Sequence, residues 1–268
     1  MAAITARGSG CDMTPVFTLF GVQLHAYPTA TVLAALVGAS LAWQALGKQG
    51  WSRRDRALAL LAMCAAFLVG ARLWNAAVTP DSYGPERQWY TLRLTGLSLC
   101  GGILGAFLAL AAMARRAGKD LWAALDACTV PAAAAFCVAR VGCFLNGCCR
   151  GVATRLPWGV VFPSLIGELD LGALGVVNFN PPVHPTQLYE LLGAALGVPL
   201  ALWAVRRFSL CAGGRFLAYG IWFSAMRICV LPLRALRYAA WIKWGVYPVL
   251  YLSLIGAGVV LLRRRRAG

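Results

Sequence analysis

The stretch ARVGCFLNGCCRG, residues 139–151, combines two guanidiniums, an amide and three thiols at the end of a long apolar run. A guanidinium in such a setting suits an anionic ligand, because its planar fork matches the oxygens of a phosphate. A cysteine thiolate can act as a nucleophile or a base, and a neighbouring cation such as Arg140 favours the thiolate. Two thiols can instead form a disulfide, and three can hold a soft metal, although CxxxxCC is not a recognised zinc spacing. This stretch, the thiol motif, is therefore a candidate site.

The elements that must position the thiol motif are membrane helices. Apolar residues make up 60% of the chain and charged residues only 13%, unlike an average soluble domain. A helix needs about 20 apolar residues to cross a hydrocarbon core of roughly 30 Å. Seven stretches qualify, at approximately 28–46, 57–78, 95–114, 121–143, 186–205, 216–236 and 245–262. The sequence therefore predicts an all-α integral membrane protein with seven transmembrane helices.

The formal charge of +16 reflects membrane topology rather than nucleic-acid binding. The basic residues gather in the connections after the first, third, fifth and seventh apolar stretches, which all fall on one side of the membrane. The positive-inside rule then places the N-terminus outside and the C-terminus in the cytoplasm. These clusters are Lys48, Arg53, Arg54 and Arg56; Arg115, Arg116 and Lys119; Arg206, Arg207 and Arg215; and Arg263 to Arg266.

The chain is predicted to be a single polytopic membrane domain over residues 1–268. No cleavable signal peptide is visible, because residues 1–16 lack an apolar core behind a basic front. We expect the first transmembrane helix to act as its own signal. The connection at about 144–185 is long enough to form a small external head between the fourth and fifth helices.

Three arginines fall within or at the ends of apolar stretches, where a cation costs several kcal/mol unless it faces a polar interior. They are Arg72, Arg140 and Arg227. The acids available inside the membrane are Asp126 and Glu190, two carboxylates for three guanidiniums. Arg72 can also be explained by snorkelling to a headgroup. An anionic ligand such as a phospholipid headgroup would supply the missing charge.

Five motifs in order resemble those of the prolipoprotein diacylglyceryl transferase family. That family has seven transmembrane helices and moves a diacylglyceryl group from phosphatidylglycerol to the thiol of a lipoprotein-precursor cysteine. The thiol motif resembles the family signature Gly-Arg-x-x-Asn-Phe-x-Asn-x-Glu-x-x-Gly. The other motifs are LHAYPTA at 24–30, GLSLCGG at 96–102, HPTQLYE at 184–190 and RICVLPLR at 227–234.

The resemblance implies a phospholipid-dependent transferase in the bacterial cytoplasmic (inner) membrane. Its partners would be phosphatidylglycerol or a similar anionic phospholipid and a lipoprotein-precursor peptide, with no cofactor and no nucleic acid. The implied catalytic residues are Tyr27, Cys100, Arg140, Asn146 and Arg227. The implied substrate-binding residues are Arg140, Cys143, Gly151, His184, Arg227 and Arg234, although His184 can equally serve as a polar anchor at the interface.

Several positions depart from the family pattern, and most of them handle protons. The family's catalytic histidine falls on Cys100, its first signature asparagine on Cys143 and its signature glutamate on Cys148. The glutamate expected in the sixth helix is Leu231, and the tyrosine expected four residues before Arg227 is Phe223. The resemblance thus implies a preserved headgroup-binding frame with altered proton chemistry.

The substituted cysteines leave two alternatives to a transferase open. A family paralogue can run thiol-redox or metal-handling chemistry through Cys143, Cys148 and Cys149, joined by Cys100 if the fold gathers all four around one cavity. A non-catalytic lipid-binding membrane protein is the other alternative. Adjacent cysteines cannot face the same direction on a regular helix, so both reach the cavity only if the chain breaks. Gly147 would allow such a break.

Overall fold

The computed structural model describes residues 16–19, 22–80, 97–162, 167–170, 176–179, 181–236 and 239–265. Within these ranges, seven helical segments are long and apolar enough to cross a membrane. Their helices are α1 (Ala26–Lys48), α2 (Arg53–Val78), α3 (Leu99–Arg116), α4 (Leu121–Leu145), α5 (Thr186–Arg207), α6 (Gly214–Val230) and α7 (Tyr247–Arg264). The predicted seven-helix membrane fold is confirmed.

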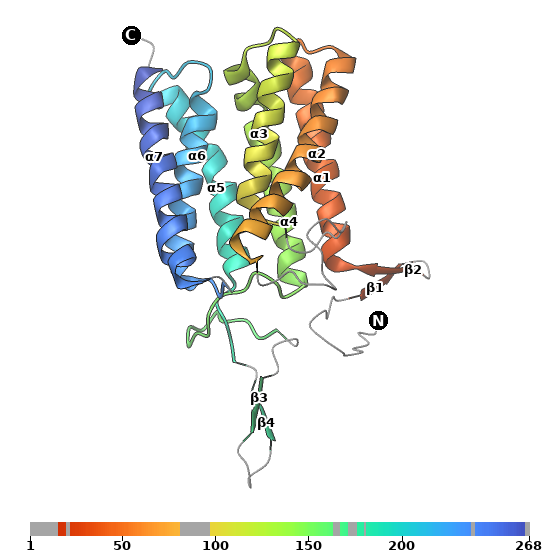
Figure 1. Ribbon diagram of the computed structural model, residues 1–268, viewed down its shortest axis with the longest axis vertical. Helices are drawn as coiled ribbons and strands as arrows, with labels where there is room; N and C mark the ends of the chain where they lie inside the picture. The colour runs from red at the N-terminus through yellow and green to blue at the C-terminus, as the bar shows by residue number, and fades with distance from the viewer. Residues whose placement is uncertain are drawn as a thin grey trace.

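Two short hairpins lie outside the helices and were not predicted. Strand β1 (Val16–Leu19) pairs antiparallel with β2 (Val22–His25), with Val16 opposite His25. Strand β3 (Gly167–Asp170) pairs antiparallel with β4 (Val176–Phe179) in the connection between α4 and α5. Figure 1 shows β3 and β4 projecting away from the end of the helix bundle. This hairpin lies inside the predicted head segment, whose place outside the membrane stays a prediction.

The α6 helix differs most from its predicted bounds, which were 216–236. The α6 helix ends at Val230, where a 3-10 turn over Leu231–Leu233 takes over. Pro232 explains this early end, because it has no N–H for the helical ladder. A π-helical turn over Ile242–Val246 precedes α7. Because a π turn inserts one residue into the helical repeat, it shifts which side chains face the bundle.

Helix packing places α4 at the centre of the bundle. The α2 helix packs against α3, and α1 packs against α4. The α4 helix also contacts α5 and α6, and α6 lies between α5 and α7. Figure 1 shows the α5–α6–α7 group beside the α1–α4 group. Segments distant in sequence thus meet along α4.

Glycines spaced four residues apart, Gly101 and Gly105 on α3 and Gly193 and Gly197 on α5, permit close helix approaches. A Cβ on Gly101 would lie 2.1 Å from the Gly70 carbonyl oxygen, and one on Gly105 would lie 2.1 Å from that of Ala66. Both contacts join α3 to α2. The pair on α5 serves the same purpose against α6, where a Cβ on Gly197 would lie 2.4 Å from the Trp222 ring.

The two ends of the bundle differ sharply in character. The connections α1–α2, α3–α4 and α5–α6, with their basic clusters, share one end with the C-terminus of α7 (Figure 1). At the opposite end α1, α3, α5 and α7 begin while α2, α4 and α6 finish. We call this opposite end the motif end, because the thiol motif lies there. The clusters are therefore on one side, as predicted, and the assignment of that side to the cytoplasm stays a prediction.

Candidate functional site

The thiol motif ends α4 by a hydrogen-bonded cap. Asn146 is the C-cap, and Gly147 follows with φ of 65°. The Gly147 N–H donates to the Phe144 carbonyl at 3.1 Å, and the Cys148 N–H donates to the Cys143 carbonyl at 3.1 Å. This pair of bonds is a Schellman motif, in which glycine takes the left-handed position at no steric cost. The Asn-Gly pair therefore stops the helix and turns the chain back over its own last turn.

The first turn of α5 holds the reversed chain in place. The Thr186 hydroxyl donates to the Cys149 carbonyl at 2.8 Å, and the Gln187 amide donates to the Cys148 carbonyl at 2.6 Å. Thr186 and Gln187 are both fully buried. Cys149 has a φ of 57°, a strained conformation for a residue with a side chain. The two polar anchors thus fix an unfavourable backbone conformation that a relaxed loop would avoid.

This break in the helix brings three thiols together. The sulfur atoms of Cys143, Cys148 and Cys149 lie within 4.8 Å of one another. Cys143 is buried on α4, whereas Cys149 is exposed. Hydrogen bonds from the Cys143 and Cys148 thiols, together with the positive charges of Arg140 and Arg234, hold the pKa of the Cys149 thiol well below its usual range. We call these three residues the thiol cluster.

Two other predicted residues border the thiol cluster. Tyr27, at the start of α1, lies within electrostatic range of Arg140 and all three thiols. The α1 helix can come this close because Gly142 has no side chain, and a Cβ there would lie 2.2 Å from that of Ala30. The buried Asn146 Oδ1 accepts no hydrogen bond from the described residues. Cys100 does not belong to the cluster, so the structure does not bring all four thiols together.

Beside the thiol cluster, one buried carboxylate binds three guanidiniums. The Arg140 Nε lies 2.7 Å from Glu190 Oε2, and the Arg234 Nη1 lies 3.2 Å from Oε1. The Arg227 Nη1 also pairs with Oε1. No side chain in this group is more than 9% exposed. We call the four residues the arginine cluster. The cluster has a formal charge of +2, and its burial makes the desolvation of these charged groups costly.

Asp126, the second predicted acid, does not balance these arginines, which corrects the sequence-based interpretation. Its carboxylate accepts hydrogen bonds from the backbone N–H groups of Gly213, at 2.9 Å, and Phe216, at 2.8 Å. Asp126 therefore caps the start of α6, near the basic end of the bundle. Arg72 is partly buried on α2 and is not among the partners of Glu190. The third arginine that pairs with Glu190 is Arg234, which was assigned only by resemblance.

Arg227 connects the arginine cluster to Cys100 through a tyrosine on α7. The Arg227 Nε donates to the Tyr251 hydroxyl at 3.1 Å. The same hydroxyl lies 3.8 Å from the Cys100 sulfur. Tyr251 is buried and was not identified from the sequence. Its only indication in the sequence was a second tyrosine hydroxyl, four residues after Tyr247, in a largely apolar helix. The sequence did show Glu190 as an intramembrane acid, but not as the common partner of three arginines.

Gly151 and His184 have structural contacts at the motif end. The Gly151 N–H donates to the His184 carbonyl at 2.9 Å, and Gly151 forms an isolated β-bridge with Arg234. A Cβ on Gly151 would lie 2.5 Å from that of His184. The His184 ring nitrogen Nδ1 lies 3.3 Å from the Tyr189 hydroxyl. These contacts suit the anchor interpretation of His184 and show that Gly151 lets the chain reach Arg234. Substrate binding by either residue stays a prediction.

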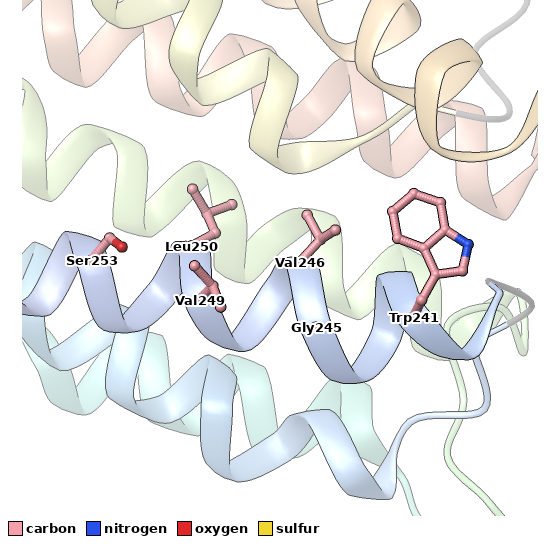
Figure 2. Close-up of a pocket in the computed structure, with 6 residues that line it drawn as sticks. All are labelled: Trp241, Gly245, Val246, Val249, Leu250 and Ser253. Carbon is pink, nitrogen blue, oxygen red and sulfur yellow. The ribbon is translucent and has the colours of Figure 1, made fainter.

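An apolar groove runs beside this site on α7. It has a volume of about 590 Å³ and is lined by Trp241, Gly245, Val246, Val249, Leu250 and Ser253. Figure 2 shows Trp241, Val246 and Leu250 projecting from the same side of the helix. A smaller cavity of about 210 Å³ shares Trp241 and Val246 and reaches α2. Val246 also packs against the buried cluster that contains Tyr251, so one side chain lines the groove and borders the site.

Comparison with known proteins identifies the family. Residues 15–263 match the family model of prolipoprotein diacylglyceryl transferase. The chain belongs to the prolipoprotein diacylglyceryl transferase family. This match includes every candidate residue from Tyr27 to Tyr251, and it confirms the resemblance seen in the five motifs.

Several relatives in this family carry the name phosphatidylglycerol–prolipoprotein diacylglyceryl transferase. The protein of Solidesulfovibrio magneticus is 38% identical over 176 residues, which cover 63% of this chain and 62% of that protein. The protein of Chloroflexus aggregans is 29% identical, covering 81% of this chain and 75% of its own. The protein of Cutibacterium acnes is 30% identical, covering 92% and 82%. The similarity to members of the prolipoprotein diacylglyceryl transferase family thus extends over most of the chain.

Proposed function

We propose that this protein transfers a diacylglyceryl group from phosphatidylglycerol to the thiol of a lipoprotein-precursor cysteine. The names of its relatives support this reaction, and the arginine cluster is the observation that carries it. Three buried guanidiniums share one carboxylate, which leaves a net positive charge in a water-poor site. The Arg234 Nε is buried and has no hydrogen-bond acceptor among the described residues. A phosphate diester with one negative charge would offset one of the two excess positive charges and supply an acceptor.

The lipid's acyl chains require an apolar surface next to its headgroup. The groove on α7 provides such a surface, and Val246 joins it to the cluster around Tyr251. In a bilayer this groove would open toward the hydrocarbon core. We therefore place the phosphate at the arginine cluster and an acyl chain along Leu250 and Val246 (Figure 2).

The transfer exchanges one bond to carbon for another. The acceptor thiolate attacks the glycerol carbon that carries the phosphate, a carbon–sulfur bond forms, and the carbon–oxygen bond to phosphate breaks. Glycerol phosphate leaves with the electron pair, and Arg140, Arg227 and Arg234 would stabilise its growing negative charge. The proton of the acceptor thiol needs a base. We assign this role to Cys100, because it lies at the end of the Arg227–Tyr251 chain.

Arginine substitutions test this function directly. Full-length protein in detergent micelles would be incubated with phosphatidylglycerol and a peptide containing the acceptor cysteine, and the modified peptide measured by mass spectrometry. We expect Arg140→Ala and Arg227→Ala each to abolish transfer. Arg207→Ala is the matched control, because Arg207 is an exposed arginine at the basic end of α5. Wild-type activity in either cluster variant would remove that arginine from the site.

Complementation in cells separates transfer from the alternatives. A bacterial strain depleted of its own transferase would express either the wild-type chain or the Arg140→Ala variant. We expect growth and lipoprotein modification only with the wild-type chain. A membrane-inserted wild-type chain that fails in both the strain and the micelle assay would contradict the proposed transferase function. Fractionation of the same cells would show whether the chain resides in the cytoplasmic membrane, and labelling of intact cells with a membrane-impermeant thiol reagent would show whether its motif end is outside.

A further inference from the structure

The thiol cluster has no role in the proposed transfer, yet the fold assembles it at an energetic cost. Cys143 reaches it from the last turn of α4, and Cys148 and Cys149 reach it after the Schellman turn. The left-handed conformation of Cys149 is unfavourable for a residue with a side chain and persists only where the surroundings impose it. Thr186 and Gln187 impose it here through the two carbonyls that they bind.

The spacing of the three sulfur atoms suits coordination of one metal ion. Zinc–sulfur bonds are about 2.3 Å long, which places three sulfurs around one zinc ion about 3.8–4.0 Å apart. The cluster's sulfurs already lie within 4.8 Å of one another, so they would need to approach by only about 1 Å to reach this spacing. A disulfide would need two sulfurs at about 2.05 Å, and all three cysteines are free. Cys149 is exposed, which gives an ion a route to the cluster.

The charges around the cluster favour a soft divalent ion. Thiolates select soft metals such as zinc and cadmium. Three thiolates and one divalent ion carry a net charge of −1, whereas the adjacent arginine cluster carries +2. The Arg140 Nη1 already donates to the Cys143 sulfur at 3.7 Å. Such a donor stabilises a metal-bound thiolate by spreading its charge, as outer hydrogen bonds do in other metal sites.

We propose that Cys143, Cys148 and Cys149 form a binding site for one soft divalent metal ion, such as Zn²⁺ or Cd²⁺. The site lies beside the arginine cluster and is distinct from Cys100, whose contact is with Tyr251. Its three protein ligands leave a fourth coordination position for water or another small ligand. Binding releases the thiol protons to the solvent.

Titration with Cd²⁺ tests the site without relying on transferase activity. Full-length protein would be purified in detergent with reductant, freed of reductant under anaerobic conditions and titrated while the ultraviolet absorption of cadmium–thiolate bonds is recorded. We expect one Cd²⁺ per chain. Cys148→Ser and Cys149→Ser should each weaken binding by at least about 100-fold, because changes to groups that merely orient ligands already cost 10- to 100-fold. Cys211→Ser, at an exposed cysteine near the basic end, should bind as the wild type does.

Alkylation of the wild-type chain gives a second measurement that does not depend on a variant's folding. Peptide mass spectrometry would follow the reaction of Cys148 and Cys149 with an alkylating reagent, with and without Cd²⁺. We expect Cd²⁺ to slow both reactions and to leave that of Cys211, an exposed thiol in the α5–α6 connection, unchanged. Equal rates with and without Cd²⁺ at Cys148 and Cys149, or undiminished binding in both serine variants, would overturn the proposal.

Discussion

Replacing Glu190 with glutamine should destabilise this protein more than any other conservative change of a single acid. The substitution keeps the size and shape of the side chain but removes the only negative charge in the arginine cluster. Three buried guanidiniums would then face one another without a counter-ion. Glu190 itself is 1% exposed, so water cannot replace the lost charge.

The size of the effect follows from the ion pairs. Two opposite charges about 4 Å apart attract by about 4 kcal/mol at an effective dielectric constant near 20. Much of this attraction offsets desolvation, so the measured quantity is the cost of leaving a buried partner unpaired, about 3–5 kcal/mol. A loss of 1 kcal/mol lowers Tm by about 2–4 °C in a chain of roughly this size. We therefore expect Glu190→Gln to lower Tm by at least about 6 °C.

Thermal unfolding of both forms in the same detergent, at the same heating rate, measures this difference. Asp126→Asn is the matched control, because it also neutralises an acid on a membrane helix. Asp126 only caps α6, and loss of a cap costs about 1 kcal/mol. A Tm for Glu190→Gln that falls no further than that of Asp126→Asn would refute the idea that Glu190 holds the three arginines together.

Three further substitutions test separate parts of the site. Gly151→Ala should lower the free energy of unfolding by about 1–3 kcal/mol, because its Cβ would lie 2.5 Å from that of His184, and unchanged thermal stability would contradict this. Cys100→Ser should reduce transfer by about 100-fold or more if Cys100 is the base, whereas Cys100→His should retain transfer, and full activity of the serine variant would exclude that role. Tyr251→Phe should weaken phosphatidylglycerol binding about tenfold, because the hydroxyl that accepts from Arg227 is lost, and equal affinity in a vesicle-binding assay would argue against it.

The helices could be predicted because membrane burial depends on local composition. Each long apolar run became a spanning helix, with bounds that shifted by a few residues. The larger shifts have local causes that hydropathy does not register. Ser98 becomes the N-cap of α3 several residues after the apolar run begins. Pro232 ends α6 six residues early, whereas the π turn at Ile242–Val246 moves the start of α7 by only two residues.

The site was harder to predict, because ion pairing depends on how helices pack. Counting acids and arginines correctly indicated an excess of buried positive charge. This count could not show that Glu190 would face Arg140 and Arg234. It also could not show that Asp126, on the same helix as Arg140, would cap α6. That outcome follows from depth along α4. Asp126 lies near the basic end and Arg140 near the motif end, about four helical turns apart at 3.6 residues per turn.

Arg140 explains why the charge excess and the thiols occur together. Its Nε pairs with Glu190 and its Nη1 donates to the Cys143 sulfur, so one guanidinium of the arginine cluster also contacts the thiol cluster. Negative charge gathered on the thiols and negative charge on a bound phosphate would therefore be stabilised partly by the same group. A bound phosphate would weaken the stabilisation that Arg140 gives to the thiolates, and the thiolates would weaken the stabilisation that it gives to the phosphate. Such coupling is reciprocal by thermodynamic necessity. The cysteines that replace polar residues of the family motif would thus change the electrostatics of the proposed lipid site as well as its proton chemistry.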